Sequence, residues 1–153
     1  MAKIFEDLFM EMQADMVFAC KDYVKGAADK IYIYISSEGR MISNDYFFEI
    51  SGQILKRHKL DSVSAQYDVS LDNQEKYNMI LIEDTLELER ICKEYDKPMP
   101  TEIKMIYDVK KNSLNVKYKY DNQWLHHKTK TPDDIANEWF EEVKSSKTGD
   151  VKI

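Results

Sequence analysis

Strict alternation of side-chain type in two segments of the chain predicts a β-sheet whose two faces differ chemically. The later segment alternates an apolar and aromatic set with a polar set: Leu114, Val116, Tyr118 and Tyr120 against Asn115, Lys117 and Lys119. The earlier segment alternates an aliphatic set with a largely aromatic set: Ile31, Ile33 and Ile35 against Tyr32, Tyr34 and Ser36. Tyrosines at this spacing either pack under a helix or meet a partner, and packing is the interpretation we favour.

Turn signals arrange further strands around these two. We predict an antiparallel meander from a turn at residues 37–39, a strand at 46–50, a reversal at Ser51-Gly52 and a third strand at 54–58. A hairpin is predicted from strands 101–109 and 113–120, joined by residues 110–112. Between meander and hairpin the signal is weaker, with a short strand at 65–69 and another at 76–83.

Three helices are predicted. Residues 2–24 carry an apolar stripe at every fourth position, and Gly26 marks a stop. In the middle of the chain, Asp84 and Glu87 form a capping-box pattern before an apolar stripe that ends at Lys97-Pro98. The last helix begins at Thr131-Pro132, where Thr caps, Pro suits the first helical position and two acids complement the helix dipole.

This order predicts a single α+β domain over residues 1–145, in which the N-terminal, middle and C-terminal helices cover one face of the antiparallel sheet. Residues 146–153 are polar, and we predict a disordered tail.

Composition restricts the class of function. A net charge of −6 argues against direct nucleic-acid binding and fits a basic protein partner. No apolar run is long enough for a membrane span, and the N-terminus lacks a signal peptide, so we expect a cytoplasmic protein. Cys20 and Cys92 are expected to be reduced, partly buried thiols, with a disulfide between them as the alternative.

No pattern for catalysis is present. His126 and His127 point to opposite faces of an extended chain and lack ligands at a recognised spacing, so with His58 they predict no metal site. The four glycines are isolated, which excludes a phosphate-binding loop, and no G-x-S-x-G motif occurs. We therefore predict no catalytic residue and no cofactor.

Acidic residues concentrate in the middle and last predicted helices, and they are our candidate binding surface for a basic protein: Glu83, Asp84, Glu87, Asp133, Asp134, Glu138, Glu141 and Glu142. A solvated helix face with favourable charge placement is the competing interpretation. Lys104, Lys117 and Lys119 are predicted to share one face of the hairpin, where lysines keep an exposed strand from pairing with other chains.

Three segments resemble the YezG-like immunity protein family: "DKIYIYI", "MPTEIKMIYDVKKNSLNVKYKYD" and "PDDIANEWFEEVKS". The family pattern has an N-terminal helix, a strand of the type W-E-K-V-Y-L-Y, a further helix, and a P-W-T-like entry into a hairpin ending in Y-x-Y-D. Residues 30–34 and 118–121 match it. Ala28 stands in place of the family's first tryptophan, Met99-Pro100-Thr101 replaces P-W-T, and the segment containing Trp139 is similar only to a divergent branch.

The resemblance implies an antitoxin that binds a cognate secreted toxin domain, often a nuclease of the LXG type, and blocks its substrate access. It implies no catalytic residue or cofactor. Two alternatives stay open. One is a small-molecule-binding or enzymatic domain whose pocket wall includes Tyr32 and Tyr34, and the other is an oligomerising domain with a self-complementary apolar patch.

Overall fold

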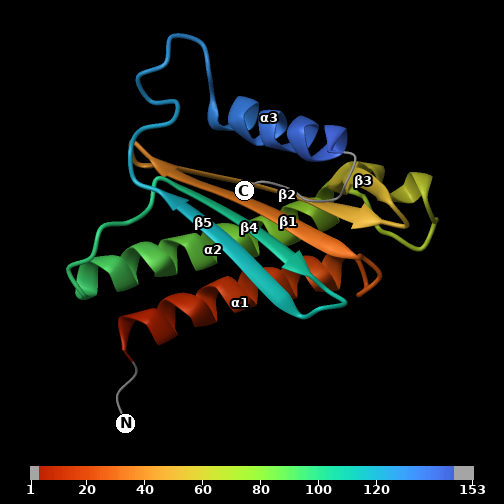
Figure 1. Ribbon diagram of the computed structural model, residues 1–153, viewed down its shortest axis with the longest axis horizontal. Coiled ribbons are helices and arrows are strands. Elements are labelled where there is room, and N and C mark those ends of the chain that lie inside the picture. The colour runs from red at the N-terminus through yellow and green to blue at the C-terminus, as the bar shows by residue number, and fades with distance from the viewer. Residues whose placement is uncertain (1–3, 147–153) are drawn as a thin grey trace.

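An antiparallel sheet with the strand order β3-β2-β1-β4-β5 lies at the centre of the protein. The computed structural model describes residues 4–146 (Figure 1). It confirms the predicted single α+β domain with a meander, a C-terminal hairpin and three helices. The strands are β1 (Lys30–Glu38), β2 (Met41–Ile50), β3 (Gln53–Lys56), β4 (Glu102–Asp108) and β5 (Ser113–Lys119).

Two tight turns set the register of the meander. Gly39 and Arg40 both have positive φ (56° and 65°), as do Ser51 and Gly52 (52° and 79°), which suits two-residue hairpin loops. The second turn was predicted correctly. The first lies later than predicted, because Ser37 and Glu38 still pair in β1, with Glu38 opposite Met41. The positive φ favours glycine at position 39, and an added Cβ there would lie 2.6 Å from Leu125 Cδ1, so the Leu125 side chain would have to shift.

Helices cover both faces of the sheet, so the prediction that they cover one face is wrong. Helices α1 (Phe5–Tyr23) and α2 (Leu71–Glu94) pack against the face that carries Ile31, Ile33 and Ile35. Helix α3 (Pro132–Ser145) lies across the opposite face, as Figure 1 shows. Three layers result, with the sheet in the middle.

The tyrosine face of β1 forms a second, smaller core under α3. Tyr32 and Tyr34 are each 1% exposed and pack with Phe47 of β2 against Trp139 and Phe140. Tyr32 stacks on Phe47 at 4.7 Å between ring centroids, and Trp139 meets Phe47 edge-on at 5.2 Å. The packing interpretation of these tyrosines is confirmed.

The middle of the chain differs most from prediction. Residues 76–83, predicted as a strand, lie inside α2, and residues 65–69 form no strand. Ser70 is the true N-cap of α2, because its hydroxyl accepts a hydrogen bond from the Asn73 N–H at 3.2 Å. Asp84 and Glu87 are therefore interior helical residues. The predicted third strand ends at Lys56, where the 3-10 helix η1 (Arg57–Ser62) begins.

The remaining elements agree with the sequence. The first helix, the hairpin and the last helix are present within a few residues of their predicted bounds. Cys20 in α1 and Cys92 in α2 are free, buried thiols. Except for Ser146, the predicted disordered tail lies outside the described residues. No helix among residues 4–146 combines the length and apolar character that a membrane span requires.

Candidate functional site

Helix α3 separates its residues into an apolar inner face and an acidic outer face. Ala136, Trp139, Phe140 and Val143 are buried against the tyrosine face of the sheet. This packing turns the five predicted acids of the last helix outward, where all are exposed: Asp133, Asp134, Glu138, Glu141 and Glu142. We call this set the α3 acidic face.

Two of these acids also have local partners. The Asp134 carboxylate accepts a hydrogen bond from the Thr131 N–H at 2.8 Å, while the Thr131 hydroxyl accepts one from the Asp134 N–H at 3.3 Å. This is the capping box that opens the helix. Glu138 forms an ion pair with Lys130 at 2.6 Å. Glu141 and Glu142 are thus the acids best placed to meet a partner without disturbing the helix, while Asp133 lies in the first turn, where its charge also complements the helix dipole.

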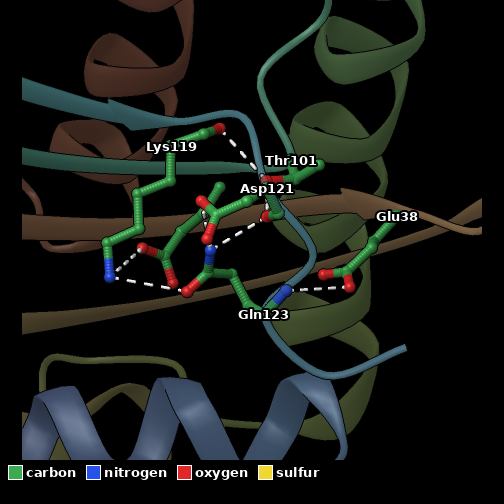
Figure 2. Close-up of polar contacts among 6 residues, drawn as sticks. Glu38, Thr101, Lys119, Asp121 and Gln123 are labelled. Atoms are coloured by element: carbon green, nitrogen blue, oxygen red, sulfur yellow. Dashed lines mark hydrogen bonds and ion pairs between the residues drawn. The ribbon is translucent and has the colours of Figure 1, made fainter. Parts of the chain in front are cut away.

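The connection from β5 to α3 is anchored by a buried carboxylate, Glu38, at the end of β1. One oxygen of Glu38 accepts the N–H groups of Gln123, Trp124 and Leu125 at 2.9, 3.2 and 2.9 Å. The Trp124 indole N–H donates to the Ser36 hydroxyl at 2.9 Å. Figure 2 shows the Glu38 contact with Gln123. These bonds fix the chain that enters α3 and so set the position of the α3 acidic face.

A second buried carboxylate, Glu102, forms an ion pair with Lys119, one of the hairpin lysines. Lys119 Nζ lies 3.6 Å from a Glu102 oxygen and donates to the Gln123 side-chain carbonyl at 3.4 Å (Figure 2). The Thr101 hydroxyl completes this network by donating to the Asp121 carbonyl at 2.6 Å. Since Glu102 is only 2% exposed, Lys119 compensates a charge that would otherwise be buried alone.

The lysine-bearing face of the hairpin is the α3 side of the sheet. The register pairs Lys104 with Lys117 and Glu102 with Lys119, which confirms that these residues share one face. Lys104 Nζ lies 5.5 Å from the Trp139 ring centre, a cation–π distance. Only part of this face is thus a solvated edge, because Lys104 and Lys119 have specific partners.

The acids predicted in the middle helix lie on α2, in the layer opposite α3, so the two acidic groups do not form one surface. Glu83 is exposed. Glu87 and Glu94 hold Arg90 between them, and the Arg90 hydrogen bond lowers the pKa of Glu87. Asp84 faces Asp15 of α1, and burial together with a hydrogen bond to that carboxyl raises the pKa of Asp84 to about 8.

The two adjacent histidines are loop residues. His126 and His127 are exposed in the connection before α3, and His127 Nδ1 accepts the N–H groups of Thr129 and Lys130 at 3.2 and 3.1 Å. Among residues 4–146, no three His, Cys, Asp or Glu side chains are arranged to hold a metal ion.

Sequence reasoning missed the anchoring residues Glu38, Glu102 and Trp124. Glu38 precedes Gly39 in a turn-like stretch, where an acid is normally solvated. Glu102 alternates correctly for the polar face of its strand, but its burial depends on a loop distant in sequence. No local signal in the sequence identifies either acid as buried.

No protein-family model matches the chain, and no curated protein matches it at a significant level. The resemblance to the YezG-like family therefore stays a prediction.

Proposed function

We propose that this protein is an immunity protein that binds a basic toxin domain, such as a nuclease, and occludes its substrate-binding surface. The observation that carries the proposal is the α3 acidic face, whose acids are exposed on a helix fixed from below by Trp139 and Phe140. In this proposal the protein acts in the cytoplasm of the cell that makes the toxin, without a cofactor or catalytic residue.

The physical basis is electrostatic complementarity with little ordering cost. A nuclease surface that holds phosphates is rich in Lys and Arg, and an acidic helix attracts it at long range and accelerates encounter. Because the capping box and the Glu38 anchor already fix α3, binding does not have to order the helix first. Occlusion then needs one antitoxin for each toxin.

The small-molecule alternative requires Tyr32 and Tyr34 to line a cavity, but both side chains are buried beneath α3. No observation favours a ligand site at that position.

The direct test is co-expression with the C-terminal domain of any LXG-type toxin that proves to be encoded beside this protein's gene. We expect growth to be restored at equimolar expression. The triple variant Asp133→Lys, Glu141→Lys, Glu142→Lys should lose protection. The matched variant Asp72→Lys, Glu75→Lys, Glu83→Lys, which reverses three exposed acids of α2, should keep it. No protection by the natural protein, together with no binding of that domain, would reject the proposal.

A further inference from the structure

A lysine from the connection before α3 lies on the α3 acidic face. Lys130 Nζ forms an ion pair with Glu138 Oε1 at 2.6 Å, and the two side chains are 39% and 53% exposed. The other four acids of this face have no ion-pair partner among residues 4–146. The face that we assign to a basic partner thus already holds one positive group, which the same chain supplies.

The position of Glu138 on the helix places this ion pair on the outward side of α3. Asp134, Glu138 and Glu141 follow one another at intervals of four and three residues, so they lie along one flank of the helix. Buried Val143 lies on the opposite flank, against the sheet. The ammonium group of Lys130 therefore lies where an approaching partner would meet it.

The backbone on both sides of Lys130 is held in place. The Lys130 N–H donates to His127 Nδ1 at 3.1 Å, and the His127 N–H donates to the Trp124 carbonyl at 2.9 Å. On the other side, Thr131 is the N-cap of α3 and belongs to its capping box. Because this backbone is already fixed, the ion pair has to order little more than two side chains, which lowers the entropic cost of the contact.

The same contact is weak enough to be displaced. Ion pairs between partly exposed side chains contribute little to stability, because water and salt screen them. A partner surface with several cations meets the whole row of acids and can replace Lys130 at Glu138. Lys130 thus competes with every basic partner, so that surfaces with few cations bind poorly.

We propose that Lys130 is an autoinhibitory contact, in which its ammonium group occupies Glu138 until a basic partner replaces it with an arginine or lysine of its own. This inference rests on the proposed function, because it concerns the regulation of the same surface. It also identifies Glu138 as an acid that a partner's cation contacts.

The test uses fluorescently labelled octalysine as the basic probe, with its affinity measured by fluorescence anisotropy at low salt. Lys130→Met removes the competing charge and keeps a long side chain. Lys128→Met is the matched control, since Lys128 is an exposed lysine of the same connection without an ion-pair partner among residues 4–146. We expect Lys130→Met to bind octalysine about threefold more tightly than Lys128→Met.

Further variants separate the ion pair from the net charge. In a Glu138→Gln background the affinities of Lys130→Met and Lys128→Met should become equal, because the acid for which Lys130 competes is gone. Lys130→Arg keeps a positive charge beside Glu138 and should bind octalysine as the natural protein does. In the natural protein with isotope-labelled lysine, saturation with unlabelled octalysine should move the Lys130 Hε signals to their position in Glu138→Gln.

Two outcomes would overturn the proposal. One is equal octalysine affinity of the two lysine variants, and the other is a difference that persists with Glu138→Gln, since Lys130 would then act through its charge alone. The α3 triple variant distinguishes these outcomes from failure of the proposed function. If it binds octalysine as tightly as the natural protein does, the α3 acidic face is not the cation-binding surface, which contradicts the proposed function as well. If it loses binding while the two lysine variants stay equal, only the inference about Lys130 is overturned.

Discussion

At the scale of single residues, Glu38 connects β1 to the loop that leads into α3. Replacing it by alanine leaves three backbone N–H groups without their acceptor, and we expect a loss of about 2 kcal/mol in the free energy of unfolding. Urea denaturation measures the loss, and hydrogen exchange should rise at Gln123 and Trp124. The matched control is Glu141→Ala, an exposed acid whose loss should change stability by less than about 0.5 kcal/mol. Equal effects of the two changes would contradict the anchoring role.

The raised pKa of Asp84 predicts that the free energy of unfolding depends on pH. Its pKa in the folded protein is about 8, against an ordinary value of 3.8, so the folded state binds this proton more tightly than the unfolded state. Stability therefore falls as the pH rises from about 4 to about 8 and is constant above that range, as far as this group is concerned.

The variant Asp84→Asn should remove this penalty, because a neutral amide can donate to Asp15 at every pH. Allowing for solvent screening of a half-buried group, we expect it to be more stable than the natural protein by about 1 kcal/mol at pH 8. At pH 4 the two should be equal. Thermal unfolding across this range measures the difference, with Glu75→Gln as the exposed control. A stability gain that does not vary with pH would count against the Asp15–Asp84 pair.

At the scale of elements, α3 depends on Trp139 for its place on the sheet. Trp139 is 1% exposed and contacts both Tyr32 and Phe47, so Trp139→Ala should cost about 3–5 kcal/mol. Its indole nitrogen has no hydrogen-bond partner among residues 4–146, so Trp139→Phe loses less and should cost about 1–2 kcal/mol. Urea denaturation distinguishes the two variants. Similar costs for both would mean that α3 is held by something other than this packing.

The α3 acidic face should act mainly on the rate of association. Reversing Asp133, Glu141 and Glu142 to lysine should slow binding of a basic partner by about tenfold or more at low salt. The difference should shrink as salt is added, because screening acts on long-range attraction. Stopped-flow association at several salt concentrations measures this effect, with the α2 triple variant as control. A slowing that is independent of salt would place the interface elsewhere.

The elements that the sequence predicts well are those with local chemical signals. The N-cap at Thr131 and the turn at Ser51-Gly52 depend only on neighbouring residues, and both are present in the structure. The first half of α2 was missed because residues 76–83 form a short apolar run that suits a strand as well as a helix. Its helical spacing becomes clear only over the full length of α2, in buried Tyr77, Leu81 and Leu88.

At the scale of the whole molecule, alternation in β1 predicted two chemically different faces but not what covers each. Isoleucines and tyrosines can both pack under helices, so the choice depends on connections that place α3 on the side opposite α1 and α2 (Figure 1). For the same reason, the predicted acidic residues do not form one surface but lie on the two opposite helix layers. The acids of α2 and α3 were predicted from composition, whereas their separation into opposite layers follows from topology alone.

The antitoxin proposal is tested most directly by pull-down of the tagged full-length protein from the cytoplasm of its native host, with mass spectrometry of whatever is recovered at stoichiometric yield. The α3 and α2 triple variants are carried in parallel. We predict a basic toxin domain at a one-to-one ratio with the natural protein and the α2 variant, and its loss with the α3 variant. Recovery of the protein alone, or of a partner that the α3 variant retains in full, would contradict the account.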